Sequence, residues 1–142
     1  MKQFSSNINI RATPEMVWAI LTDGPGYSRW NPEITRVDGT IALGKKITAH
    51  VMLHGGKIQP VSVRVTAMEP PRQMVWTGGL PMKLFTGQRK FSIVPKNDGT
   101  VDFTMQVRFT GPLASLIAGT LGDRQPDIDA LAVGLKEFAE RQ

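Results

Sequence analysis

The sequence predicts an α+β fold, in which a curved antiparallel sheet of seven strands wraps around one long C-terminal helix, with two short helices after the first strand. Three features of the 142 residues predict it. Apolar and polar residues alternate in the opening segment, and again from about residue 34 to residue 110. Turn-forming residues interrupt that alternation at intervals. After Gly111-Pro112 the apolar spacing becomes helical.

The first strand is expected in the opening segment and should end near Arg11, because the alternation there is that of a half-buried strand. A short helix should follow, because Thr13 can cap it and Pro14 suits its first position. The glycines and the proline of residues 23–26 would stop this helix. A second short helical turn is expected over residues 27–30.

Six further strands complete the predicted sheet. The boundaries between them carry residues typical of chain reversals, such as Gly55-Gly56 and Asn97-Asp98-Gly99. The last strand is the clearest, because apolar and polar residues alternate throughout it and leave one face dry and the other wet. The predicted strands cover residues 34–38, 46–53, 59–68, 73–77, 83–94 and 100–110.

A long helix closes the predicted fold. Apolar residues recur at helical spacing from Leu113 to Phe138. Gly122 and Pro126 interrupt this pattern, so one kinked helix or two consecutive helices would fit, and we expect one kinked helix. Wherever the helix leaves the concave face of the sheet uncovered, an apolar cavity is predicted, which is a common place for a small-molecule site.

Length and composition indicate one globular domain over residues 1–142, with 41% hydrophobic and 20% charged residues. The sequence has no cysteine, which excludes disulfides, thiolate nucleophiles and cysteine-ligated metals. No signal segment and no run of about 20 apolar residues, the length needed to span a bilayer, is apparent. We therefore expect a cytoplasmic protein.

The formal charge of +5 raises the question of nucleic-acid binding. The basic residues are spread out, however, and no basic run exceeds two residues. Aromatic residues are not interleaved with them as a stacking platform for single strands requires. We expect a mildly basic solvated surface and no nucleic-acid partner.

No catalytic or metal-binding set is apparent, and no cofactor is expected. His50 and His54 are the only histidines, and on a strand about 13 Å separates residues four apart, too far to share one metal. Their parity also points them to the wet face. No serine lies in a nucleophile-elbow pattern, and phosphate-loop and dinucleotide fingerprints are absent.

The sequence resembles the SRPBCC superfamily, and within it the polyketide cyclase/dehydrase and lipid-transport branch, which is related to START-type lipid-transfer domains and pathogenesis-related allergens. The resemblance runs from about Lys2 to Glu140. It implies the helix-grip fold and a small hydrophobic ligand, and a minority of members are enzymes. The residues that carry it, mostly turns and core anchors, are Phe4 to Ile10, Ala12-Thr13-Pro14-Glu15, Val17-Trp18, Tyr27, Trp30-Asn31-Pro32, Gly39, Gly44, Pro70, Trp76, Gly87, Phe91, Phe109 and Gly111.

The residues that line the cavity are predicted by strand parity and helix spacing, and the resemblance adds Trp30. Arg89 is the polar candidate, because its parity places a guanidinium among apolar groups. It could orient a carboxylate or another anionic group of a ligand through a bidentate contact. It could instead form an ion pair with Asp23 or Glu33, or extend outward to solvent from the start of its strand. The full predicted lining is Trp30, Val51, Leu53, Val63, Trp76, Arg89, Phe91, Phe103, Met105, Leu116, Leu131 and Leu135.

These observations favour a binding or carrier protein for a small hydrophobic or amphipathic ligand such as a lipid, a polyketide or an aromatic acid. A cyclase or dehydratase that acts in the same cavity is the alternative, although inward parity offers almost no acid or base. A protein-interaction module of the chaperone-activator type is a third hypothesis and would need an exposed apolar patch. The chain could be a monomer or a homodimer.

Overall fold

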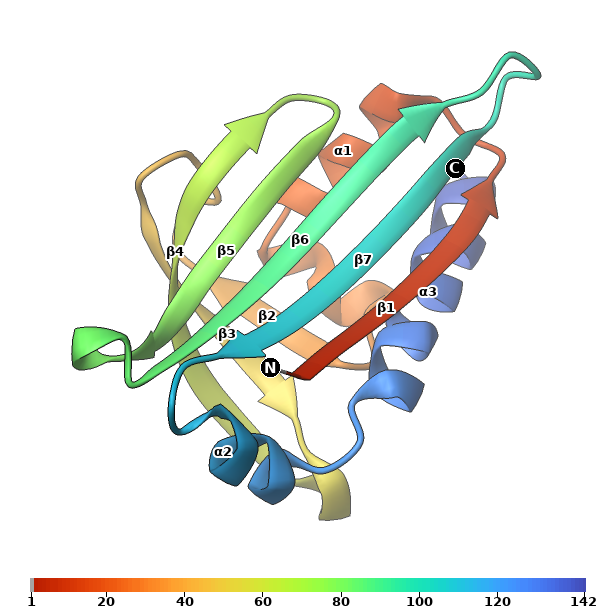
Figure 1. Ribbon diagram of the computed structural model, residues 1–142. Helices are drawn as coiled ribbons and strands as arrows, with labels where there is room; N and C mark the ends of the chain where they lie inside the picture. The colour runs from red at the N-terminus through yellow and green to blue at the C-terminus, as the bar shows by residue number, and fades with distance from the viewer. Residues whose placement is uncertain (1) are drawn as a thin grey trace.

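The computed structural model describes residues 2–142, except for the side chain of His54. Seven strands form one antiparallel sheet in the order β1-β7-β6-β5-β4-β3-β2, which curls around the last helix (Figure 1). The fold class predicted from the sequence is confirmed. The strands are β1 (Lys2–Ile10), β2 (Ile34–Asp38), β3 (Lys46–Met52), β4 (Ile58–Glu69), β5 (Gln73–Leu80), β6 (Phe85–Pro95) and β7 (Val101–Thr110).

The described residues also form three α-helices and three short 3-10 helices, of which α2 and α3 follow the last strand. At the start of the first helix the Met16 backbone N–H donates to Oγ1 of Thr13 over 3.1 Å, and Pro14 occupies the first helical position as expected. The helices are α1 (Pro14–Thr22), η1 (Pro25–Arg29), η2 (His54–Gly56), η3 (Pro81–Lys83), α2 (Ala114–Leu121) and α3 (Gln125–Glu140). None of the helices within residues 2–142 is both long enough and apolar enough to cross a bilayer.

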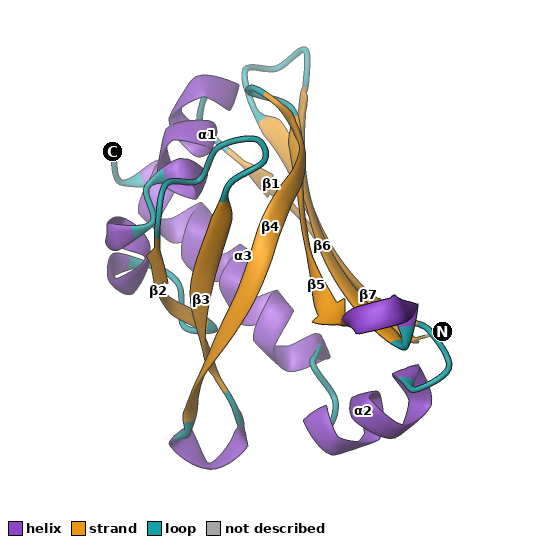
Figure 2. Cartoon of the chain, turned by 90° about the vertical axis from the view of Figure 1, so that its left-hand side faces the viewer, coloured by secondary structure: helices purple, strands orange, loops and turns teal. Residues whose placement is uncertain are grey.

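The main core lies between the sheet and α3. Ile128, Leu131 and Leu135 form the buried stripe of α3, and all three have no exposed surface. They face the inward side chains of the sheet, including Phe91 and Phe103, which are equally buried. Figure 2 shows α3 running across the concave side of the sheet, with α2 displaced toward one end. The core therefore covers only one part of the concave face, and the end near α2 lies outside it.

The expectation of one kinked C-terminal helix is wrong. The chain forms two helices, because Gly122 takes a φ of 76° and a ψ of −164°, which no helix accommodates. The Gly122 N–H still donates to the Ala118 carbonyl over 3.0 Å, so α2 ends in an ordered way. Arg124 then precedes α3. This break moves α2 away from the axis of α3 and places it over the end of the sheet (Figure 2).

The strand β5 is longer than expected. Its expected end was residue 77, but Gly78 and Gly79 also pair with β6, in the register Gly78↔Gly87 and Gly79↔Thr86. A Cβ atom on Gly78 would lie 2.8 Å from the Ser62 carbonyl oxygen, so only glycine allows β4 and β5 to approach this closely. The paired strands reach further toward α2 as a result, and they end at η3.

Candidate ligand-binding cavity

A cavity of about 520 Å³ lies between the concave face of the sheet and the α2–α3 region. It occupies the end of the sheet where β3 and β7 finish and where β4 and β6 begin (Figure 2). Ile117 and Leu121 of α2 cover it from the helical side. Its lining consists of Glu33, Ala49, Val51, Leu53, Gln59, Pro60, Val61, Ser62, Val63, Trp76, Gly78, Gly79, Leu80, Phe85, Gly87, Gln88, Arg89, Val107, Phe109, Ile117, Leu121 and Arg124.

Strand alternation supplies most of the apolar wall. Val51 lines the cavity from the end of β3, Val63 from β4 and Trp76 from β5, and Leu53 lines it from the position just after β3. Each shares the parity of buried residues on the strand that carries or precedes it, which is why the sequence pattern identified them. The wall is therefore a continuation of the core face beyond the region that α3 covers.

Two glycines create much of the open space. Gly78 and Gly87 are directly opposite on β5 and β6, and both line the cavity. A Cβ atom on Gly87 would contact the Phe109 ring at 3.5 Å, an ordinary van der Waals distance, so a larger side chain there would extend into the cavity. Because the two glycines have no side chains, the face of the sheet is hollow at this pair. The next pair on the same face, Trp76 and Arg89, has large side chains that fill the corresponding space.

A buried ion cluster closes one side of the cavity. Arg89 on β6 donates from Nη1 and Nη2 to the two carboxylate oxygens of Glu33, over 2.7 and 2.9 Å. Arg124 donates from Nη2 to Oε2 of the same carboxylate over 2.9 Å. Nη1 of Arg124 lies 3.1 Å from Oδ2 of Asp127. The Glu33 and Arg124 side chains are only 1% and 5% exposed, so both depend on these partners.

The two arginines keep Glu33 ionised. Burial alone would raise the pKa of Glu33, but the charges of Arg89 and Arg124 and their hydrogen bonds outweigh that effect, and the pKa of Glu33 lies below its ordinary value. Glu33 is therefore a carboxylate at neutral pH. Both of its oxygens accept hydrogen bonds from guanidinium groups, which leaves it poorly suited to proton transfer.

A tight turn places Glu33. Oδ1 of Asn31 accepts hydrogen bonds from the backbone N–H groups of Glu33 and Ile34, each over 2.9 Å. The carboxylate thus enters the cavity from the residue just before β2. Sequence parity did not place Glu33 inside, because the residue precedes the strand and its orientation follows the Asn31 turn. Arg124 was missed for a related reason, since it stands in the break between two helices, where spacing carries no information.

Aromatic rings pack behind the ion cluster. Trp76 lies against Phe91, with ring centroids 4.9 Å apart, and stacks on Tyr27 at 6.4 Å. The Tyr27 hydroxyl donates to the Leu21 carbonyl over 2.6 Å, and burial raises the pKa of this phenol far above its ordinary value. Nε1 of Trp76 is buried and has no hydrogen-bond acceptor. This indole N–H is thus an unused donor beside the cavity.

Five of the residues predicted to line the cavity do line it: Val51, Leu53, Val63, Trp76 and Arg89. Arg89, however, uses both terminal nitrogens on Glu33, which is the ion-pair alternative and not a free fork for a ligand carboxylate. Five others lie in the main core and do not reach the cavity, because α3 covers that part of the sheet. These are Phe91, Phe103, Met105, Leu131 and Leu135.

The remaining two predicted residues lie elsewhere on the molecule. Trp30 is buried against Tyr27 and borders a separate surface depression with Pro32 and Val133. Leu116 is 70% exposed, because the cavity-facing side of α2 carries Ile117 and Leu121 instead. The prediction of Leu116 was therefore wrong by one position along the helix, since its neighbour Ile117 covers the cavity.

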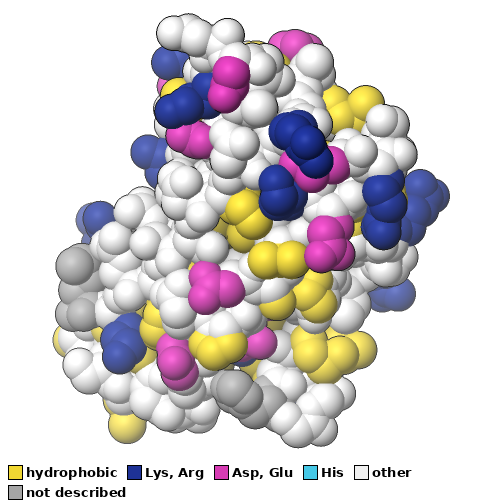
Figure 3. All heavy atoms as spheres, turned by 90° about the vertical axis from the view of Figure 1, so that its right-hand side faces the viewer, with side chains coloured by type: hydrophobic (Ala, Val, Ile, Leu, Met, Phe, Trp, Pro, Cys, Tyr) yellow, Lys and Arg dark blue, Asp and Glu magenta, His cyan; other side chains and the backbone are white. Residues whose placement is uncertain are grey.

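The outer face of the sheet carries His50. Its Nε2 lies 2.8 Å from Oδ2 of Asp38 and 3.2 Å from Nη2 of Arg36, in an exposed cluster. The side chain of His54 lies outside the described part of the chain. Among the described residues no three acidic, histidine or cysteine side chains come together in a way that could hold a metal ion. On the face shown in Figure 3, acidic and basic side chains are interspersed.

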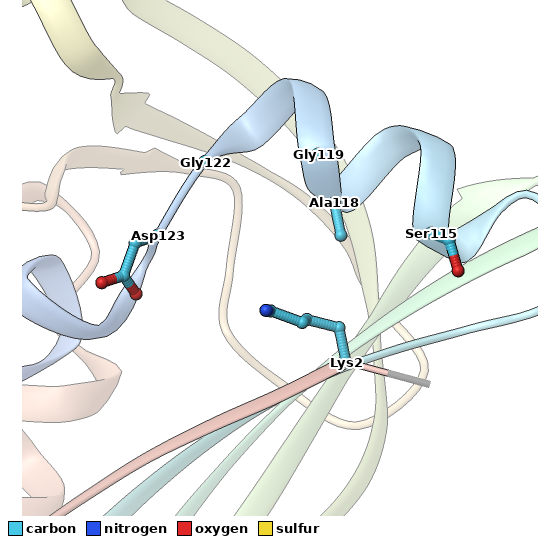
Figure 4. Close-up of a pocket in the computed structure, with 6 residues that line it drawn as sticks. All are labelled: Lys2, Ser115, Ala118, Gly119, Gly122 and Asp123. Carbon is cyan, nitrogen blue, oxygen red and sulfur yellow. The ribbon is translucent and has the colours of Figure 1, made fainter.

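A third hollow, of about 410 Å³, lies between α2 and the start of β1. Figure 4 shows Lys2 of β1 extending between Ala118 of α2 and Asp123 of the helix break. Gly119 and Gly122 supply much of its wall.

A curved antiparallel sheet that grips a C-terminal helix beside an apolar cavity defines a START-like, helix-grip protein. The chain matches the family described as "Polyketide cyclase / dehydrase and lipid transport" over residues 1–140, and it belongs to that family. Among curated proteins, no sequence matches the chain.

Solved structures share this fold at low sequence identity. The Zhui aromatase/cyclase from Streptomyces sp. R1128 superposes with a TM-score of 0.77 at 14% identity, over 99% of this chain and 94% of that one. A START superfamily protein from Mycobacterium smegmatis gives 0.71 at 20% identity, over 98% and 97% of the two chains. The Aha1 dimer from Colwellia psychrerythraea gives 0.72 at 18% identity, over 99% and 97%.

Proposed function

We propose that this protein binds and carries a small hydrophobic or amphipathic molecule in the cavity between the sheet and α2. The observation that carries the proposal is the cavity itself, an apolar space of about 520 Å³ that is closed on one side by a buried ion cluster. Burial of apolar ligand surface would supply most of the affinity, at about 25 cal/mol per Å². Membership of a family that includes lipid transport supports the same reading.

The ion cluster suggests which end of the ligand lies inside. Arg89 and Arg124 present only N–H groups, both Glu33 oxygens are already occupied, and Nε1 of Trp76 has no acceptor. A ligand oxygen that accepts hydrogen bonds, such as a carbonyl or a carboxylate, suits this side better than a donor group does. The apolar remainder of the ligand would lie along the strand ends and under α2.

Binding is a better fit than catalysis for this geometry. A cyclase or dehydratase needs a group that exchanges a proton with its substrate. The one acid in the cavity wall is Glu33, which is held ionised between two guanidinium groups. The tyrosine behind the wall donates to the Leu21 carbonyl and is buried. Neither group is available to move a proton at neutral pH.

Filling the cavity tests the proposal. Gly87→Val adds a side chain that points into the space beyond Phe109, on a strand where valine is well tolerated. We expect the variant to bind 1-anilinonaphthalene-8-sulfonate and dodecanoate at least about tenfold more weakly than the wild type, because the contacts with the ligand are displaced. Fluorescence titration and calorimetry measure this directly.

The matched control is Thr86→Val, the neighbouring residue of β6, whose parity faces the other side of the sheet. It should bind both compounds as the wild type does. Equal binding by Gly87→Val and the wild type would place the ligand elsewhere. Failure of the wild type to bind any compound, together with an empty protein in native mass spectrometry after purification, would contradict the carrier function itself.

A further inference from the structure

Three segments surround the outer end of the cavity. They are η2 with the start of β4, η3 with its flanking strand ends, and α2. Figures 1 and 2 place all three at the same end of the molecule, opposite the loop that joins β6 to β7. Each contributes residues to the cavity wall, namely Pro60 and Val61, Leu80 and Phe85, and Ile117 and Leu121. A molecule that enters the cavity from this end passes between them.

Exposed apolar side chains gather on these three segments. Met82 is 90% exposed and Leu116 is 70% exposed, although both are large and apolar. We define the mouth rim as the six exposed apolar residues of the three segments: Ile58, Val61, Leu80, Met82, Leu84 and Leu116. The other exposed large apolar residues of the described chain lie apart from this end. Such clustering marks a contact surface.

The same segments carry no acidic residue. Residues 53–62, 78–90 and 109–122 contain neither aspartate nor glutamate, in a chain with 12 acidic residues. Lys57 and Lys83 are exposed there, and the nearest acid along the chain is Asp123, which faces Lys2 in Figure 4. At the opposite end of the sheet acids and bases are mixed, as in the 3.2 Å ion pair of Lys96 with Asp102. The mouth rim is therefore the end of the molecule that suits an anionic surface.

The backbone of η3 holds Met82 outward. Met82 and Lys83 both adopt positive φ angles, 60° and 57°, which is unfavourable for residues other than glycine. The Leu113 N–H donates to the Leu84 carbonyl over 2.9 Å and ties the start of α2 to this tip. Backbone strain of this kind destabilises the folded state and is typically found at functional sites, and here it presents an exposed methionine beside a lysine.

We infer that the mouth rim docks on the surface of an anionic phospholipid bilayer. Met82, Leu116 and their apolar neighbours would enter the interface between headgroups and acyl chains, while Lys57 and Lys83 would lie among the phosphates. The cavity would then open toward the membrane, so that an apolar ligand could cross between the two without passing through water. Docking does not require an occupied cavity, so it can be tested apart from ligand binding.

The test is flotation of the purified full-length chain with vesicles of phosphatidylcholine and phosphatidylglycerol at a ratio of three to one. We expect binding that weakens with added salt, because the lysine contribution is screened. Met82→Asp/Leu116→Asp should lower the bound fraction at least about tenfold, because both side chains would lose their apolar contact. Lys57→Glu/Lys83→Glu should abolish the preference for phosphatidylglycerol over pure phosphatidylcholine vesicles.

Leu43→Asp/Val94→Asp is the matched control, because both residues are more than half exposed but lie at the opposite end of the sheet. It should float as the wild type does. The inference is overturned if the wild type binds neither vesicle, or if both aspartate pairs reduce binding equally. It is also overturned if the wild type is a dimer without vesicles and Met82→Asp/Leu116→Asp a monomer, since a second copy would then cover the mouth rim.

Discussion

Glu33 is the residue on which the ion cluster depends. Its carboxylate is the shared partner of Arg89 and Arg124, and it is almost completely buried. Removing its charge would leave two guanidinium groups facing each other in an apolar wall. A buried group that loses its partner costs much more than the intact pair contributes, because the remaining charge cannot be solvated.

Glu33→Gln should therefore lower the free energy of unfolding at pH 7 by about 3–5 kcal/mol. Urea titration followed by circular dichroism measures this value. Glu137→Gln, on the exposed side of α3, is the control and should change it by less than about 0.5 kcal/mol. If both substitutions cost the same, Glu33 does not hold the cluster together.

The pH dependence of this contribution has a definite sign. Because the pKa of Glu33 is lowered in the folded state, its stabilisation is complete above the ordinary glutamate pKa of about 4.3 and is lost as the pH falls through the lowered value. The difference in unfolding free energy between the wild type and Glu33→Gln should thus shrink between pH 7 and pH 3. A difference that stays constant over this range would contradict the lowered pKa.

The sequence predicted only some of the individual residues that line the cavity. Arg89 was found because strand parity is reliable in the middle of a long strand such as β6. Glu33 was named as one possible ion-pair partner of Arg89, but parity did not place it in the cavity wall, because it lies in a turn whose orientation depends on local hydrogen bonds. Arg124 was missed because it lies in a helix break. Leu116 was predicted in place of Ile117 because apolar residues lie on two sides of this short helix. Their spacing therefore does not show which side faces the sheet.

Among the elements, α2 has the most particular placement. Gly111 precedes it with a φ of 104°, and a Cβ atom there would lie 2.7 and 2.8 Å from the carbonyl oxygens of Leu84 and Lys83. The close approach lets α2 begin directly beside η3. The sequence did not predict this contact, since glycine patterns show that a reversal occurs but not which carbonyl it meets.

Gly111→Ala should destabilise the protein by about 1–3 kcal/mol, because both the backbone angle and the space are wrong for a side chain. Gly44→Ala separates the two causes, since Gly44 has a φ of 80° but nothing within 4 Å of a Cβ atom. That control should cost only about 1 kcal/mol. Thermal unfolding of both variants provides the comparison, and equal losses would show that the contact with η3 is unimportant.

The whole concave face divides into a filled part under α3 and a hollow part under α2. The sequence predicted the fold class because alternation over nearly eighty residues followed by helical spacing allows few other architectures. It did not predict the division, because core and cavity residues share the same parity. Only the position of α3 decides that Phe103 is packed while Val63 faces open space.

The variants Leu135→Ala and Val63→Ala compare the stability contributed by the filled part and by the hollow part of the concave face. Leu135 has no exposed surface, and its truncation should cost about 2–5 kcal/mol through the cavity that it leaves. Val63 already borders a cavity, so its truncation should cost less than about 1 kcal/mol while changing ligand affinity. Chemical denaturation measures both. Similar losses at the two sites would mean that the hollow end is packed in solution.

The sheet order has a consequence for how the chain assembles. The strand β1 pairs only with β7, in the register Lys2↔Phe109 to Ile10↔Val101, so the first element waits for the last strand before it gains a partner. The hairpins from β2 to β7 can form as soon as their neighbours exist, whereas this pairing closes a loop that contains most of the chain. On a ribosome, β1 would therefore gain its strand partner only after β7 has emerged, and its inward side would be covered later still, when α3 packs against it.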